Sequence, residues 1–256
     1  MGDQAQILRK RMEASREPKK ARTIAVVSGK GGAGKSNIAL NFSLELINRN
    51  KKVIIFDLDI GMGNINILLG LQPRKTFADL FDGYLSIFDI IEEGPKNLHY
   101  IAGGTGFNDL LQLDDRMKEY FYQQFHRLED MYDYIIFDMG AGIDEDSLCF
   151  ILAADECIVV TTGEPTSFTD AYSLIKMILN HGGKMPLHVI LNRAKAKKDS
   201  KTLERFQQVV NQFLHIEIQP MGIIPEDKLV SEAVVRQTSY LLLNEKSPAS
   251  KSMKRL

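Results

Sequence analysis

Short runs of Val, Ile and other apolar residues recur along the chain, and longer segments of mixed polarity separate them. The runs are apolar at successive positions, which is typical of strands buried in a parallel sheet with helices on both faces. On this pattern we predict strands at residues 23–28, 52–56, 98–102, 134–138, 157–162 and 187–192.

The segments between these strands are long enough for helices. The pattern predicts helices at residues 35–48, 115–131, 167–180, 200–213 and 226–237. This repeated order of strand and helix predicts an α/β fold, with a doubly wound, mainly parallel sheet flanked by helices. We expect one such domain over residues 23–244, with residues 1–22 as a basic segment and linker before it and residues 245–256 as a tail.

Composition narrows the class of protein. The chain has 256 residues, 44% of them hydrophobic, which is enough for a large core. The formal net charge of -1 argues against a protein that coats nucleic acid through overall charge, so nucleic acid is not an expected partner. Cys149 and Cys157 lack CxxC spacing, and the N-terminus lacks the apolar core of a signal peptide. A cytoplasmic location is therefore predicted.

The segment GKGGAGKS, residues 29–36, matches the phosphate-loop pattern GxxxxGK[ST] between a predicted strand and a predicted helix. Glycines let backbone N–H groups turn towards phosphates, Lys35 can reach the β and γ oxygens, and the Ser36 hydroxyl can bind Mg²⁺. A nucleoside triphosphate with Mg²⁺ is the expected ligand. The predicted binding residues are Gly29, Gly31, Gly32, Ala33, Gly34, Lys35, Ser36 and Asn37.

Three aspartates follow the apolar runs at the ends of two further predicted strands: Asp57 and Asp59 after the first, and Asp138 after the second. In a parallel sheet the ligand lies beyond the carboxyl ends of the strands, so these acids should face the phosphate loop. Asp57 and Asp138, with Ser36, are predicted to anchor the metal. For Asp57 the alternative is an aspartate that caps a helix or turn.

Several motifs together resemble one family. They are KGGAGKS with its early Lys30, FDLDIGMGNINILLGL, FDMGAG, TTGEPTSFTDAY, LNR and GIIPED. Residues 23–240 thereby resemble the deviant Walker A P-loop ATPases typified by MinD and ParA. The resemblance implies slow, Mg²⁺-dependent hydrolysis of ATP, coupled to formation of a homodimer that sandwiches the nucleotides.

The resemblance also implies roles for single residues. Lys30 would cross the dimer interface to the phosphates of the other subunit, Lys35 would bind those of its own, and Asp59 would orient the attacking water. A lysine supplied across an interface stabilises charge on the transferred phosphoryl group, as an arginine finger does. The alternative for Lys30 is a solvated loop lysine. The residues implied to flank the adenine are Asn192, Arg193 and Pro225.

The N-terminal segment DQAQILR, residues 3–9, resembles the DQAxxLR motif of the FlhG family, MinD-like regulators of flagellar number and placement. The resemblance implies that this segment stimulates FlhF, a GTPase of the signal recognition particle type, and that flagellar basal-body switch (C-ring) proteins are further partners. The alternative is a disordered basic tail. The implied contacts to the GTPase are Asp3, Gln4, Ala5, Leu8 and Arg9.

The tail is expected to differ from the family, whose members end in an amphipathic helix that holds the ATP-bound dimer on the membrane. Residues 245–256 offer only Met253 and Leu256 as large apolar side chains among basic ones, too little apolar area for stable anchoring. We expect the start of such a helix, truncated, on a cytoplasmic protein that associates peripherally with the inner face of the cell membrane.

Other functions on the same fold stay open. A division-site ATPase of the MinD type and a DNA-partitioning ATPase of the ParA type share these motifs. A redox enzyme of the nitrogenase-reductase kind would need a cysteine just after each of two strands. Cys149 lies instead between two predicted strands, in a segment that we also expect to be helical, and Cys157 lies within a predicted strand.

Overall fold

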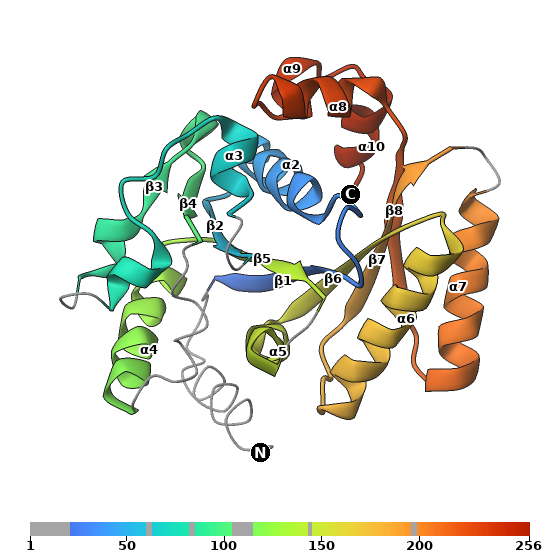
Figure 1. Ribbon diagram of the computed structural model, residues 1–256, viewed down its shortest axis with the longest axis horizontal. Coiled ribbons are helices and arrows are strands. Elements are labelled where there is room, and N and C mark those ends of the chain that lie inside the picture. Colours follow the sequence, from blue (N-terminus) through green and yellow to red (C-terminus); the bar gives the residue numbers. More distant parts are fainter. Residues whose placement is uncertain (1–20, 60–62, 82–84, 104–114, 143–144, 196–198) are drawn as a thin grey trace.

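The computed structural model describes residues 21–59, 63–81, 85–103, 115–142, 145–195 and 199–256. Their strands form one eight-stranded sheet in the order β3-β4-β2-β5-β1-β6-β7-β8 (Figure 1). Neighbouring strands are parallel except for β3, which pairs antiparallel with β4 at the edge. The strands are β1 (Arg22–Ser28), β2 (Val53–Leu58), β3 (Glu92–Glu93), β4 (His99–Ile101), β5 (Tyr134–Ala141), β6 (Glu156–Thr162), β7 (Leu187–Ala194) and β8 (Gln219–Pro225).

Helices cover both faces of this sheet, so the predicted doubly wound α/β fold is confirmed. On one face lie α2 (Lys35–Asn48), α3 (Ile65–Leu69), α8 (Lys228–Val235), α9 (Tyr240–Leu243) and α10 (Pro248–Met253). On the other lie α4 (Asp115–Glu129), α5 (Glu145–Ala153), α6 (Pro165–Asn180) and α7 (Asp199–Leu214). Three 3-10 turns, Phe77–Leu80, Ile87–Ile90 and Pro95–Asn97, complete the described elements.

The central strands are apolar at successive positions because each face of the sheet has its own core. Along β1, Ala25 and Val27 pack into one core, whereas Ile24 and Val26 pack into the other. All four are buried. Burial on both faces is the physical reason that the sequence shows unbroken apolar runs.

All six predicted strands and all five predicted helices are present, with boundaries shifted by a few residues at most ends. The helix at Lys35–Asn48 has the predicted bounds. The sequence pattern missed β8, because this edge strand is only partly buried and contains Pro220 and Gly222. Edge strands tolerate residues that a central strand does not.

The predicted end of the domain near residue 244 does not coincide with the end of the packed structure. Helix α10 contacts β8 and α2, and its Ala249 and Met253 are fully buried in the same core as α2. Leu256 lies against β8, so close that a Cβ on Gly222 would collide with its side chain. The tail therefore belongs to the domain, and Met253 is unavailable to a membrane in this conformation.

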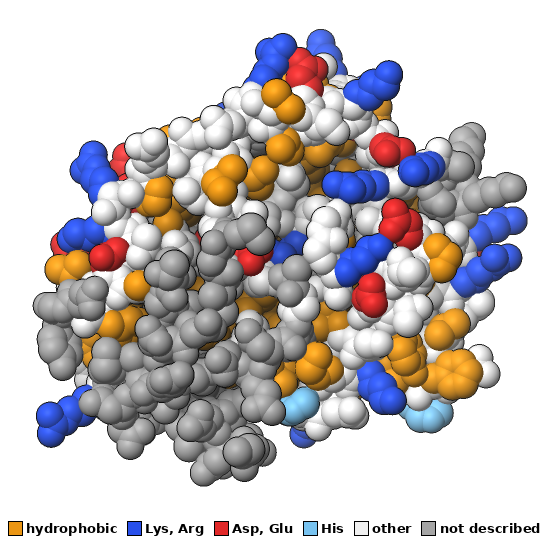
Figure 2. All heavy atoms as spheres, in the orientation of Figure 1, with side chains coloured by type: hydrophobic (Ala, Val, Ile, Leu, Met, Phe, Trp, Pro, Cys, Tyr) orange, Lys and Arg blue, Asp and Glu red, His pale blue; other side chains and the backbone are white. Residues whose placement is uncertain are grey.

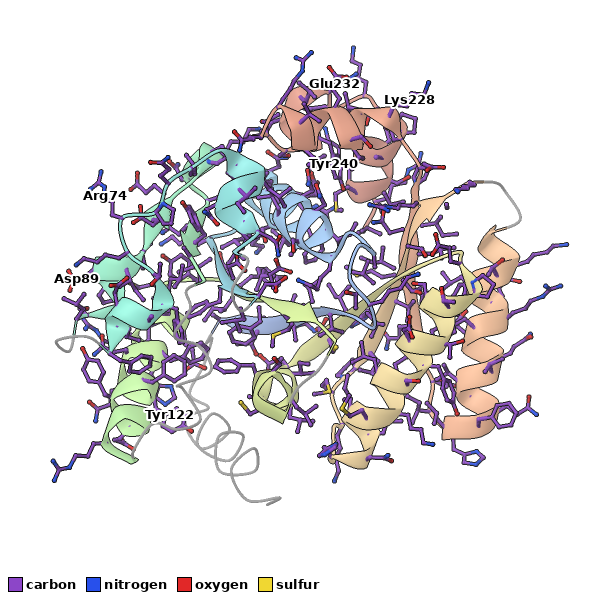
Figure 3. All side chains as sticks on the ribbon, in the orientation of Figure 1. Arg74, Asp89, Tyr122, Lys228, Glu232 and Tyr240 are labelled. Atoms are coloured by element: carbon purple, nitrogen blue, oxygen red, sulfur yellow. The ribbon has the colours of Figure 1, made fainter. Side chains whose placement is uncertain are left out.

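Helices α8 and α9 form a layer above α2. Tyr240, the first residue of α9, is buried, whereas Lys228 and Glu232 of α8 point away from the sheet (Figure 3). Buried Asn41 of α2 holds this layer, because its Oδ1 accepts hydrogen bonds from Ser239 Oγ at 2.7 Å and Leu241 N at 3.2 Å. Among the described residues, the helices are too short or too polar to cross a membrane.

Candidate nucleotide-binding site

The phosphate loop connects β1 to the N-terminus of α2, as its sequence pattern predicts. Gly32 and Gly34 have φ angles of 78° and 89°, a left-handed conformation that residues with a Cβ rarely adopt. A Cβ on Gly34 would also lie 2.3 Å from Nδ2 of Asn192, which donates a hydrogen bond of 2.8 Å to the Ala33 carbonyl. Asn192, near the end of β7, therefore holds the phosphate loop in place through this contact.

Lys35 and Asp138 form a buried ion pair at the centre of the site. Lys35 Nζ lies 2.6 Å from Asp138 Oδ1 and 3.3 Å from Ser36 Oγ, and the two charged side chains are 5% and 0% exposed. Asp138 lies beside Asp57 in the β2–β5 register. The geometry thus brings together the phosphate-binding lysine and the predicted metal residues, which are far apart in the sequence.

One carboxylate oxygen of this cluster is suited to bind a metal ion. Asp138 Oδ2 is buried and, within the described part of the chain, has no hydrogen-bond partner. A buried carboxylate oxygen without a donor is costly unless a cation or water satisfies it. The oxygen-rich donor set of Ser36 and Asp138 is the kind that Mg²⁺ prefers. The residues therefore fit a bound Mg²⁺–nucleotide.

Asp57 has a second function in this structure. Its Oδ2 accepts backbone hydrogen bonds from Asn64 at 2.7 Å and Ile65 at 2.9 Å, and Oδ1 accepts one from Asp59 at 3.2 Å. The carboxylate thus caps the start of α3 and ties it to the end of β2, which agrees with the capping alternative. Burial and the neighbouring Asp138 carboxylate raise the pKa of Asp57 to about 7.

Asp59, the predicted water-orienting residue, lies at the edge of the same cluster. Its Oδ2 accepts a hydrogen bond of 2.6 Å from Asn64 Nδ2. A Cβ on Gly140 would lie 3.7 Å from Asp59 Oδ1, so the end of β5 passes close to this carboxylate. The pKa of Asp59 is raised, chiefly by burial. Asp59 therefore lies where the segment after β2 meets the end of β5.

Lys30 lies at the rim of the site, away from Lys35. Its Nζ donates to Glu164 Oε2 at 2.7 Å and to Thr166 Oγ1 at 3.1 Å, both at the start of α6. The Lys30 side chain is 29% exposed. It is thus neither a freely solvated loop lysine nor a ligand of the Lys35 cluster, and sequence reasoning did not identify Glu164 as its partner.

The predicted adenine-flanking residues come from the adjacent ends of β7 and β8, where Ala194 pairs with Pro225. Asn192 is buried against the phosphate loop, and Arg193 is exposed with a φ of 54°. Two residues after Pro225, Asp227 accepts backbone hydrogen bonds from Leu229 in α8 and from Ala249 in α10. This rim of the site is therefore tied to the C-terminal helix.

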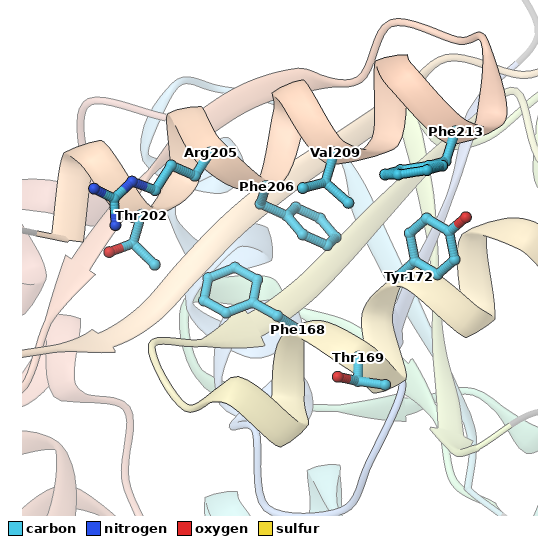
Figure 4. A pocket seen from close by; sticks show the side chains of 8 residues that line it. All are labelled: Phe168, Thr169, Tyr172, Thr202, Arg205, Phe206, Val209 and Phe213. Carbon is cyan, nitrogen blue, oxygen red and sulfur yellow. The ribbon is translucent and has the colours of Figure 1, made fainter.

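A separate groove of about 540 Å³ lies between α6 and α7 (Figure 4). Apolar side chains gather over this part of the surface (Figure 2), and Phe213 and Val209 are 62% and 43% exposed. The groove offers apolar contact rather than acid–base chemistry. Its lining residues are Phe168, Thr169, Tyr172, Thr202, Arg205, Phe206, Val209 and Phe213.

A parallel sheet with a phosphate loop, a buried lysine and carboxylates at the carboxyl ends of its strands defines a P-loop nucleotide-binding protein. Residues 24–240 match the family model of the CobQ/CobB/MinD/ParA nucleotide-binding domain. The chain belongs to this family and is an ATPase of the MinD/ParA type.

Three similar proteins illustrate the relationship. The chain is 33% identical over 232 residues to the antiactivator FleN of Pseudomonas aeruginosa, covering 90% of this chain and 83% of FleN. It is 34% identical over 214 residues to the flagellum site-determining protein YlxH of Helicobacter pylori, covering 82% and 72%. The septum site-determining protein MinD of Pyrococcus horikoshii, solved with Mg-ADP, superposes with a TM-score of 0.74 at 26% identity, covering 92% and 93%.

These findings confirm the resemblance to the MinD/ParA family and to flagellar relatives within it. Nucleotide with Mg²⁺ binds a solved relative, which agrees with the predicted ligand. The individual roles assigned to site residues stay predictions. The predicted GTPase contacts at residues 3–9 lie outside the described residues.

Proposed function

We propose that this protein is an ATP-driven molecular switch that forms a homodimer around two nucleotides. The separation of its two loop lysines is the observation that carries the proposal. Lys35 is buried against Asp138, whereas Lys30 lies at the rim with its side chain partly exposed. A rim lysine is in a position to reach phosphates that belong to a second subunit.

In this proposal, each site residue has a separate role in ATP hydrolysis. Lys35 and the loop N–H groups would bind the β- and γ-phosphates, and Ser36 with Asp138 would hold Mg²⁺, whose charge would offset the negative charge on the phosphates. Asp59 positions the attacking water from the segment that Asp57 ties down. Lys30 of the other subunit stabilises the transferred phosphoryl group. Hydrolysis would then require the dimer.

Size-exclusion chromatography with light scattering tests this proposal. Wild-type protein and Asp59→Ala, which blocks turnover, are compared in ADP and in ATP with Mg²⁺. We expect monomer in ADP and dimer in ATP, with the dimer longer-lived in Asp59→Ala. A protein that stays monomeric in every nucleotide would rule out the switch.

We propose further that the switch regulates flagellar number and placement. The names of two relatives, the antiactivator FleN and the flagellum site-determining protein YlxH, support this assignment. Division-site placement of the MinD type and DNA partitioning of the ParA type are the alternatives, and strongly salt-dependent binding to duplex DNA would favour the latter. C-ring proteins are the proposed structural partners.

The N-terminal segment would give the protein its second activity. In our proposal Gln4 enters the active site of the GTPase FlhF and orients water or senses the γ-phosphate, and Arg9 makes a charge contact, as residues delivered in trans do in other GTPases. Asp3 would cap the helix, while Ala5 and Leu8 would form its narrow apolar stripe.

Paired glutamines make this proposal testable in the full chain. Gln4→Ala should abolish stimulation of the FlhF GTPase rate, whereas Gln6→Ala, at a position that the DQAxxLR motif leaves variable, should not. Both variants should retain wild-type ATPase activity, because the segment lies outside the ATPase domain. Equal stimulation by wild type and Gln4→Ala would show that the assigned role is wrong.

Membrane association is proposed to be peripheral and weak in this chain. The apolar side chain of Met253 is buried in α10, so contact of this segment with lipid requires α10 to leave the domain. Co-sedimentation with anionic liposomes in ATP should therefore recover only a small fraction of the protein. ATP-dependent recovery of most of it would contradict this expectation.

A further inference from the structure

The contact between Lys30 and Glu164 joins two segments that the fold holds in place. Gly29 is packed so tightly against α6 that a Cβ there would lie 2.3 Å from the Asp170 carbonyl carbon. At the start of α6, Ser167 Oγ lies 3.0 Å from Thr161 Oγ1 and accepts a hydrogen bond of 3.0 Å from Thr162 N. The two acceptors of Lys30 are thus presented by a braced helix start.

The charges around Glu164 favour its ionised form. Its pKa is lowered by the hydrogen bond and charge of Lys30, and to a smaller extent by Lys195 and Arg193. Glu164 therefore opposes a group of three cations at the rim of the site. The acceptors for the Lys30 ammonium group are a carboxylate and a hydroxyl of its own chain.

This arrangement conflicts with the role proposed for Lys30. One ammonium group has to break its bonds to Glu164 and Thr166 before it reaches phosphates on another subunit. In a symmetric dimer both copies of Lys30 have to leave Glu164 and Thr166 in this way. Each exposed ion pair contributes little on its own, but both contribute to one dimerisation equilibrium.

We propose that Glu164 is a positioning residue that holds Lys30 on its own subunit and so raises the protein concentration at which the ATP-bound dimer forms. The inference rests on the proposed dimeric switch. Two groups compete for the Lys30 ammonium group: the Glu164 carboxylate of the same subunit and the nucleotide phosphates bound by the other subunit. Lys195 and Arg193 keep the surroundings of Lys30 positive when Glu164 is neutralised.

Sedimentation velocity of the full chain in ATP and Mg²⁺ tests the inference, with Asp59→Ala present throughout to block turnover. Glu164→Gln keeps the size of the side chain and removes its charge. Glu245→Gln is a matched control, because Glu245 also holds a lysine, Lys254, at 2.7 Å and is similarly exposed. Lys30→Ala and Lys30→Ala/Glu164→Gln complete a double-mutant cycle.

We expect Glu164→Gln to dimerise about two- to thirtyfold more tightly, the range that two exposed ion pairs produce, and Glu245→Gln to match its parent. In the Lys30→Ala background the Glu164 substitution should change nothing, which separates an effect through Lys30 from one of net charge. If the parent dimerises and Glu164→Gln leaves its dimer unchanged or weaker, the inference is wrong while the switch stands. A parent that never dimerises overturns both.

Discussion

Docking of α10 onto the ATPase domain leads to a quantitative prediction about stability. Met253 is fully buried in the core shared with α2 and α9, although the sequence suggested a side chain available to a membrane. A six-residue helix cannot form stably by itself in water, so tertiary packing must hold α10 in place. Truncation of Met253 should therefore destabilise the domain.

The expected magnitude follows from burial. Met→Ala substitutions in cores cost about 2–5 kcal/mol, and a short helix near the chain end can partly relax into the cavity. For Met253→Ala we expect a loss of about 2–3 kcal/mol in the free energy of unfolding. For a chain of this size, that corresponds to a fall in Tm of roughly 4–12 °C.

Urea titration followed by circular dichroism measures this change. Met131→Ala is the matched control, because Met131 is 46% exposed and the same atoms are removed. We expect the control to lie within about 0.5 kcal/mol of wild type. If Met253→Ala were as mild as Met131→Ala, α10 would not be docked in solution, and the tail would be free to act elsewhere.

Three further predictions concern the phosphate loop, Asp57 and the packing of α9 on α2. Gly34→Ala should weaken binding of a fluorescent ATP analogue at least about tenfold. Gly182→Ala, with a similar φ of 82° but no atom within 4 Å of its Cβ, should bind as wild type does. Without nucleotide, the free energy of unfolding should fall as pH rises from about 4 to about 7, because Asp57 has a pKa of about 7 in the folded protein and an ordinary pKa of 3.8. In urea titrations across this range, Asp57→Asn should make the free energy of unfolding depend less on pH. An unchanged pH dependence in this variant would contradict the raised pKa of Asp57. Asn41→Ala should lower the free energy of unfolding, measured by thermal unfolding, by about 2–3 kcal/mol, because it leaves the buried Ser239 hydroxyl and the Leu241 N–H without their acceptor. A loss below about 0.5 kcal/mol would show that water replaces the Asn41 amide as acceptor.

The parts of this protein that the sequence predicts well are those encoded by neighbouring residues. The strand, loop and helix around Gly29–Ser36 are local, because chain direction alone places the glycines, Lys35 and Ser36 at one helix start. Asp57 and Asp138 were placed at the same sheet edge because parallel strands end together. Because these central strands are buried on both faces, their apolar runs mark their positions and their ends in the sequence.

The pairings that operate the site are different, because they depend on contacts between distant segments. The partner of Lys30 is Glu164, 134 positions away, and the brace of the phosphate loop is Asn192, 159 positions from Ala33. Among many glutamates and asparagines with similar local sequence, no periodicity marks these two. Their roles are visible only when α6 and β7 are seen beside the loop.

The sequence by itself determined the class of the protein, the position of its phosphate loop and the carboxylates that face it, because each follows from local pattern and strand order. Only the tertiary structure decided that Asp57 caps α3, that Lys30 is held at α6 and that Met253 is buried in the core of the domain. A side chain's role depends on what the fold packs against it, and packing between distant segments is not encoded in any one of them.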